Sequence, residues 1–357
     1  MITPPVDELS QRRRARRLAL LIAVPSVAML AFINFHFLFR FAYLAPSSLI
    51  KATVADYRTR IRGPKVYYAT LYSERGTRSR ALVPLPYTTL TFQPGDGFND
   101  LGFASRDSYA AQIADAKAVH ARDGRVVVLT GGGAAVNGFE DRGDVPSLIE
   151  RRLSGGEAPL DARVFSMAVE PWTSSEELAA MTHWAADLAP DVIIAFDGYN
   201  DLSRVFVPGR NLNVEFPFGY PAVRDFYSLK YASDYADTQL AESGYPAVIA
   251  AYARNLEILG DWMWARKGGL VIAPQPVAEA SGDGTSDSKI ARHYGELVGA
   301  ARAVARRRES TVFVDFASVH AGSGPDDFYP AAQLQRRART RVADALSSTL
   351  RTVLAGR

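Results

Sequence analysis

Five short, nearly uninterrupted apolar runs, separated by longer amphipathic stretches, dominate the chain after Arg125. Apolar runs of this kind are typical of strands that are buried on both faces, and the stretches between them have helical spacing. The alternation predicts a three-layer, doubly wound α/β domain with a parallel sheet of about five strands, which we place at residues 122–357. The runs are RVVVLT (125–130), ARVFSMAV (162–169), DVIIAF (191–196), GLVIAP (269–274) and TVFVDF (311–316).

The loops after these runs form the candidate site, because ligands of doubly wound sheets bind at the carboxyl ends of the strands. Residues 202–244 interrupt the alternation at this face, and we interpret them as a cap insertion. Aromatic residues in this cap are either a partner-binding surface or core side chains that cover the cleft. The candidates for partner binding are Phe216, Phe218 and Tyr220.

The N-terminus has the pattern of a membrane anchor. Five arginines within residues 12–17 are followed by an uncharged stretch from Leu18 to Phe39. A helix of roughly 22 residues, at about 1.5 Å each, crosses the ~30 Å hydrocarbon layer. A cleaved signal peptide is the alternative, but its apolar region is shorter. We therefore predict a basic tail (1–17), one transmembrane helix (18–40) and a membrane-proximal segment (41–121).

The arginines before the predicted span indicate its orientation. Positive charge favours the cytoplasmic side, so we expect a single-pass protein of a bacterial-type inner membrane with its main domain in the periplasm. Asn34 and His36 lie inside the span, where polar side chains are costly against lipid. They indicate either contact with a partner helix or an interfacial position. The expected partners are the lipid bilayer, through residues 18–40, and other membrane protein subunits.

Charge and composition exclude several functions. The formal net charge is only +3 and the arginines are dispersed, whereas nucleic-acid binding needs a concentrated basic face. The chain has no cysteine, which excludes disulfides, thiolate metal sites and cysteine nucleophiles. No His/Asp/Glu group has metal-ligand spacing, so we expect neither a metal nor a cofactor.

The first apolar run ends in a glycine-rich turn, VVVLTGGGAAVNG (126–138). A dinucleotide-binding turn needs three glycines in the pattern G-x-G-x-x-G. Gly131 and Gly133 fit that pattern, but the third position is Val136, and no P-loop lysine follows. Nucleotide binding is therefore disfavoured.

Several blocks of the sequence resemble the SGNH (GDSL-like) hydrolase superfamily. Their order along the chain matches the family, and the resemblance implies a flavodoxin-like SGNH fold and acyl hydrolysis. The blocks are FNDLGFAS (98–105), GGGAAVNG (131–138), SMAVEPWTSSEEL (166–178), GYND (198–201), LVIAPQP (270–276) and a last block from Pro330 to Leu346.

The resemblance places glycine, glutamine and proline where the family has its catalytic triad. The nucleophilic serine falls on Gly133, the histidine base on Gln333 and its aspartate partner on Pro330. None of these side chains attacks, titrates or orients a base as acyl transfer requires. The remnant of the oxyanion hole is the side-chain amide of Asn200 and the backbone N–H of Ala168.

The sequence therefore favours a degenerate hydrolase domain that acts as a non-catalytic accessory or scaffold subunit of a membrane complex. One alternative is an active envelope esterase, deacetylase or acyltransferase with a rearranged triad, in which Thr130 is the only hydroxyl beside the glycine turn. Another is a carbohydrate-binding protein that uses the old cleft without chemistry. For Asn200 and Asp201 the alternative role is structural, because short polar side chains often hold loop backbone.

Overall fold

The computed structural model describes residues 67–73, 76–84, 90–155, 158–170, 172–203, 244–277, 286–316, 327–329 and 333–355. Several predicted features lie outside these residues: the transmembrane helix at 18–40 with Asn34 and His36, the cap residues Phe216, Phe218 and Tyr220, and Pro330. Among the helices that are described, none is both long and apolar enough to cross a membrane. The anchor and the cap therefore remain predictions.

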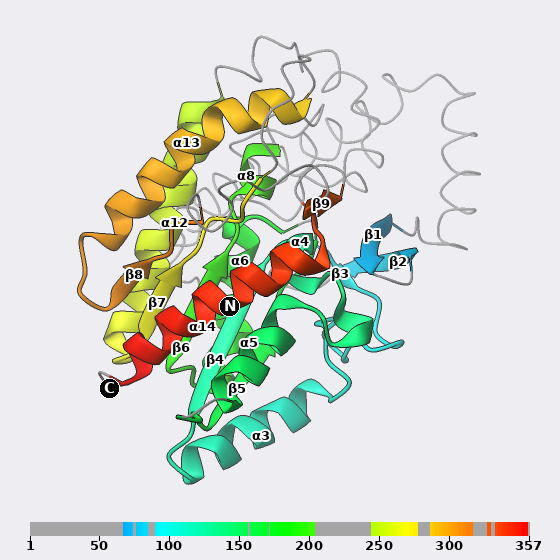
Figure 1. Cartoon of the computed structure of the whole chain (residues 1–357), viewed down its shortest axis with the longest axis vertical. Helices are drawn as coiled ribbons and strands as arrows, with labels where there is room; N and C mark the ends of the chain where they lie inside the picture. The colour runs from blue at the N-terminus through cyan, green and yellow to red at the C-terminus, as the bar shows by residue number, and fades with distance from the viewer. Residues whose placement is uncertain are drawn as a thin grey trace, which may run out of the picture. The chain divides into compact units, whose positions relative to one another are not determined.

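A five-stranded parallel sheet forms the centre of the domain, as the apolar runs predict (Figure 1). Its strand order is β5-β4-β6-β7-β8, which is the flavodoxin-like order 2-1-3-4-5. β4 is flanked by β5 and β6, so that Leu129 lies opposite Ser166 on one side and Ile194 on the other. The strands are β4 (Arg125–Gly131), β5 (Ala162–Ser166), β6 (Val192–Phe196), β7 (Gly269–Ile272) and β8 (Thr311–Phe313).

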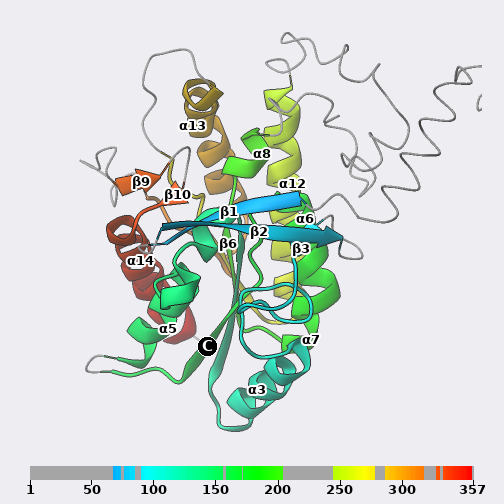
Figure 2. The same cartoon turned by 90° about the vertical axis from the view of Figure 1, so that its right-hand side faces the viewer.

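Helices cover both faces of this sheet, which makes the three layers (Figure 2). α5 (Val145–Ser154) packs along α14 (Arg336–Ala355) on one face. On the other face α12 contacts both α6 and α13, and α3 contacts α7. The elements of this second layer are α3 (Tyr109–Ala121), α6 (Ser174–Ala180), the π-helical turn η2 (Met181–Ala185), α7 (Ala186–Leu188), α12 (Tyr245–Ala265) and α13 (Ser286–Ala305).

Short elements lie around the carboxyl ends of the strands. α4 (Gly133–Val136) and η1 (Phe139–Asp141) follow β4, and α8 (Tyr199–Ser203) follows β6. β9 (Phe328–Tyr329) and β10 (Gln333–Leu334) form an antiparallel pair just before α14. The sequence pattern extends the last helix back to residue 331, but Gln333 and Leu334 are in a strand because they pair with β9.

Helix starts follow local sequence signals. Asp144 caps α5, since its carboxylate accepts a hydrogen bond from the backbone N–H of Ser147. Thr173 and Glu176 form a capping box at the start of α6. α12 has a proline in its first turn and spans the stretch YPAVIAAYARNLEILGDWMWA, as its apolar spacing predicts.

The segment before residue 122 differs from the connecting piece that we expect from sequence. It forms an antiparallel sheet of β1 (Tyr67–Ser73), β2 (Gly76–Pro84) and β3 (Leu90–Phe92), followed by α3, which packs on β4 and β5. The compact unit consequently begins at Val66 rather than at residue 122. α3 buries only Gln112, Ala116 and Val119, so its apolar period is too weak to identify it by sequence.

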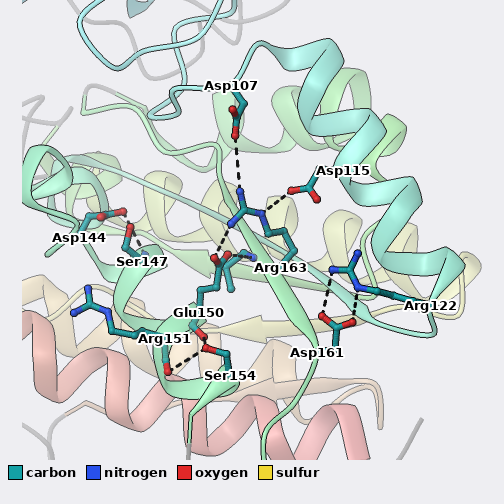
Figure 3. Close-up of polar contacts among 11 residues, drawn as sticks. Asp107, Asp115, Arg122, Asp144, Ser147, Glu150, Arg151, Ser154, Asp161 and Arg163 are labelled. Carbon is teal, nitrogen blue, oxygen red and sulfur yellow. Dashed lines mark hydrogen bonds and ion pairs between the residues drawn. The ribbon is translucent and has the colours of Figure 1, made fainter.

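Arg163 on the edge strand β5 ties helices of both layers to the sheet (Figure 3). Its Nε donates to Asp115 of α3 at 2.7 Å, and its Nη1 donates to Glu150 of α5 at 2.6 Å. The same Glu150 carboxylate accepts from the backbone N–H of Val164 at 2.8 Å. These contacts explain why α3 belongs to the same domain as the sheet.

Candidate functional site

The glycine turn forms the strand–turn–helix that the family resemblance implies. β4 ends at Gly131, Gly132 caps the next helix, and Gly133 is the first residue of α4. Gly131 has φ +156°, and a Cβ on it would lie 2.2 Å from the carbonyl oxygen of Phe196 in β6. Gly133 is buried and has no side chain, so the position of the expected nucleophile carries no reactive group.

Asn200, the predicted oxyanion donor, is directed at the loop after β5. Its Nδ2 donates to the carbonyl oxygen of Glu170 at 2.5 Å and to that of Trp172 at 2.6 Å. A side-chain amide has two N–H donors, and both are used here. A Cβ on Gly132 would lie 2.6 Å from this Nδ2, so the amide closely covers the glycine turn. This geometry agrees with the structural alternative for Asn200.

Ala168, the other predicted remnant, lies fully buried in the same loop. The residues on either side of it continue the pairing with β4: Met167 N–H donates to Leu129 at 2.8 Å, and Val169 N–H donates to Gly131 at 3.0 Å. The loop is therefore held against the end of β4. This places Ala168 and Asn200 at the same edge of the sheet as the glycine turn.

Gln333 lies in β10, which contacts α4. Its backbone pairs with Tyr329 of β9. Gln333, where we expect the family's histidine, therefore lies in a strand that contacts the helix of the glycine turn. Pro330 lies outside the described residues.

A hydroxyl and a carboxylate do meet beside Asn200, but in a capping role. Asp201 accepts from the backbone N–H of Ser174 at 3.1 Å and from its Oγ at 2.6 Å. The side chain of Asn255 in α12 donates to the same Oγ at 3.0 Å. Ser174 and Asp201 are both buried, and together with Asn255 they fix the first turn of α6 against α8 and α12.

Two buried carboxyls that the sequence does not single out lie beneath this edge of the sheet. Asp197 follows β6 and accepts from the hydroxyl of Tyr252 at 2.7 Å. Glu177 of α6 is 1% exposed, and neither of its oxygens has a hydrogen bond of normal geometry in the described part of the chain. Thr130 is close enough to lower the pKa of Glu177, but its hydroxyl also lacks a hydrogen bond of normal geometry among the described residues.

Burial controls how these carboxyls titrate. It raises the pKa of Glu177, which the neighbouring carboxylates of Asp197 and Asp201 raise further. Burial also raises the pKa of Asp197 to about 6, although the hydrogen bond from Tyr252 and the neighbouring Glu177 lower it. Both buried carboxyls therefore have a higher pKa in the folded protein than as free side chains. Asp197 could have been identified from the sequence, because it is an acidic residue directly after a buried strand.

The described residues contain no group of three His, Asp or Glu side chains arranged to hold a metal ion. His183 lies in η2 beside Trp184, 6.2 Å between ring centroids, and His293 stacks on Tyr245 at 3.8 Å. Neither histidine is placed by these contacts at the glycine turn. The described structure brings together the turn, the loop of Ala168, Asn200 and the backbone of Gln333.

We expect Asn200→Ala to lower the free energy of unfolding by about 1–3 kcal/mol, because it leaves two loop carbonyls without their donor. Urea denaturation of the full chain in mild detergent measures this change. Ser203→Ala on the same helix is the control, since it removes only a hydroxyl that donates to the Asn200 carbonyl at 2.9 Å, and we expect a smaller loss. Unchanged stability of Asn200→Ala would contradict the structural role.

Comparison with known proteins gives distant likenesses only. No protein-family model matches the chain, and no curated protein is similar to it. Among solved structures, it is similar to a GDSL-like lipase from Bacteroides thetaiotaomicron at 11% identity and TM-score 0.45, over 68% of this chain and 97% of that one. It is also similar to an acetylxylan esterase from Geobacillus stearothermophilus at 13% identity and TM-score 0.43, over 64% and 94%. Likenesses this low carry no argument about activity.

Proposed function

We propose that this protein is a catalytically inactive domain of SGNH-hydrolase type that acts as an accessory subunit of a membrane-associated complex. The main support for a loss of catalysis is the hydrogen bonding of the Asn200 side chain. Both of its amide donors bind loop carbonyls, beside a turn whose nucleophile position is Gly133. An oxyanion donor used in this way stabilises the fold rather than a transition state.

Acyl transfer needs a nucleophile, a base within hydrogen-bond reach and a group that orients the base. Two described hydroxyls in this region, those of Thr130 and Ser174, are buried and have carboxyl groups beside them. In this proposal neither of these two hydroxyls is an accessible nucleophile, and neither is paired with an imidazole base. For this reason we favour the inactive domain over an active esterase.

The accessory role is proposed from the N-terminal sequence. An anchored domain without catalytic groups acts through a surface or a partner, and the predicted span at 18–40 contains two polar residues that lipid disfavours, Asn34 and His36. In this proposal the span pairs with a helix of another subunit in the inner membrane. The domain at residues 66–357 then lies on the periplasmic side.

The experiment compares complexes extracted in mild detergent. We expect the full chain to migrate with partner subunits, and Asn34→Leu/His36→Leu to stay in the membrane but migrate alone. Ser26→Leu is the matched control, because it changes a polar residue elsewhere in the span, and we expect it to keep the complex. A serine-directed phosphonate should label none of these proteins.

Two outcomes contradict the proposal. Migration of the full chain as a free monomer in every mild detergent, with no crosslinked partner in native membranes, excludes the accessory role. Stoichiometric phosphonate labelling of one hydroxyl excludes the loss of catalysis.

A further inference from the structure

A small pocket rich in arginine opens between the loop that precedes α5 and the start of α14. Its volume is about 60 Å³. Four of its lining residues are arginines and one is an aspartate, so the formal charge of the lining is 4 − 1 = +3. We call these residues the arginine pocket; they are Asp141, Arg142, Gly143, Leu148, Arg151, Arg336 and Arg339.

Arg339 forms the buried part of the arginine pocket. Arg339 is 1% exposed. Its Nε donates to the carbonyl oxygen of Gly143 at 2.8 Å, and its Nη1 donates to the carbonyl oxygen of Leu334 at 2.9 Å. A Cβ on Gly138 would lie 2.7 Å from its Nη2, so the backbone closely surrounds this guanidinium. A buried cation is costly unless negative charge compensates it, and the nearby Asp144 carboxylate interacts with this guanidinium. Burial raises the pKa of Asp144, whereas the positive charge of Arg339 lowers it.

The rim of the pocket adds three exposed cations, Arg142, Arg151 and Arg336. Arg151 donates to the carbonyl oxygen of Arg142 at 2.6 Å, and in Figure 3 its guanidinium extends away from the cluster around Arg163. Arg336 is the first residue of α14, and the first turn of that helix contains no acid. A cation at the positive end of a helix is unfavourable, so a bound anion would stabilise this end of α14.

We propose that the arginine pocket binds a phosphate group. Guanidinium groups match phosphate oxygens through paired N–H donors, which makes arginine the preferred phosphate ligand at shaped sites. A water molecule takes about 10–15 Å³ on this measure, so the pocket has room for about four to six such volumes, enough for the four oxygens of one phosphate. The phosphate belongs either to a soluble monoester or to a lipid headgroup. This inference does not depend on the proposed loss of catalysis.

Two double variants test the pocket with the same change in charge. Arg151→Gln/Arg336→Gln removes two rim arginines, whereas Arg152→Gln/Arg337→Gln changes their exposed neighbours on the same helices, which do not line the pocket. Inorganic phosphate is titrated into the full chain by calorimetry at constant ionic strength. We expect binding to wild type and control, and at least tenfold weaker binding to the rim variant.

A second arm identifies the source of the phosphate. Glycerol 3-phosphate is titrated in solution, and phosphatidic acid vesicles are compared with phosphatidylcholine vesicles. Preference for either phosphate source, lost in the rim variant alone, supports the pocket and names the source. An equal loss in both double variants indicates general surface charge and overturns the proposal, as does the absence of phosphate binding to wild type in both arms.

Discussion

Gly131→Ala is expected to destabilise the domain by at least about 3 kcal/mol, or to prevent folding. Overpacking typically costs about 1–3 kcal/mol, and here the new Cβ would lie 2.2 Å from the carbonyl oxygen of Phe196. That oxygen belongs to the neighbouring strand, and Gly131 pairs with Phe196 in the sheet register. The obstacle is backbone at the centre of the sheet, so no side-chain rotation relieves it. The positive φ of Gly131 adds strain for any residue with a side chain.

The control for this variant is Gly299→Ala in α13. A Cβ at Gly299 meets nothing within 4 Å, and the residue is an exposed position of a helix. Alanine there is expected to stabilise the protein by about 0.5–1 kcal/mol, from helix propensity alone. Both variants are measured by urea denaturation of the full chain, followed by tryptophan fluorescence. A Gly131→Ala protein with wild-type stability would show that the turn does not have this geometry.

Glu177→Gln is expected to stabilise the protein at neutral and alkaline pH. Burial raises the pKa of Glu177 in the folded state, and Asp197 and Asp201 raise it further. A folded-state pKa above the unfolded value means that the native protein binds more protons, so stability falls as pH rises through this window. Glutamine is neutral at every pH, so its burial does not require the free energy that protonation or burial of the carboxylate requires above the unfolded pKa. We therefore expect a gain in the free energy of unfolding at pH 7 and pH 8 and little change near pH 4.5.

The pH profile supplies the sharper test. Asp197 contributes in the same direction, because its pKa is raised to about 6 from 3.8. Its contribution is present below pH 4 and is lost by pH 6, and it amounts to about 3 kcal/mol at most. We therefore expect the wild type to lose stability between pH 4 and pH 8 more steeply than Glu177→Gln.

Glu176→Gln is the matched control for Glu177→Gln. Glu176 accepts from the backbone N–H of Thr173 at 2.9 Å at the start of α6, where a negative charge is favourable. Its replacement is expected to leave stability unchanged or to lower it by up to about 1 kcal/mol. If Glu177→Gln lowers stability at pH 8, the carboxylate stabilises the native state, and a raised pKa of Glu177 is contradicted.

Local sequence determined the layers of this fold. Each apolar run after Arg125 indicates a buried strand because longer amphipathic stretches separate the runs, and α12 shows its apolar spacing and its initial proline within one continuous stretch. The same kind of signal fails for α3, which buries a glutamine and two small or branched residues. It also fails for β10, whose two residues form a strand only because β9 is beside them.

The sequence also predicts where a hydrolase of this type would have its catalytic groups, since short local blocks place Gly133 and Asn200. Only the tertiary structure decided what the remaining groups do. Asn200 bonds to carbonyls 28 and 30 residues away, and Arg339 to one 196 residues away. Such contacts depend on how separate elements pack, and burial by that packing sets the pKa of Glu177 and Asp197. Periodicity along a chain carries information about neighbours three or four residues apart, whereas hydrogen-bond partners and desolvation are properties of the folded domain.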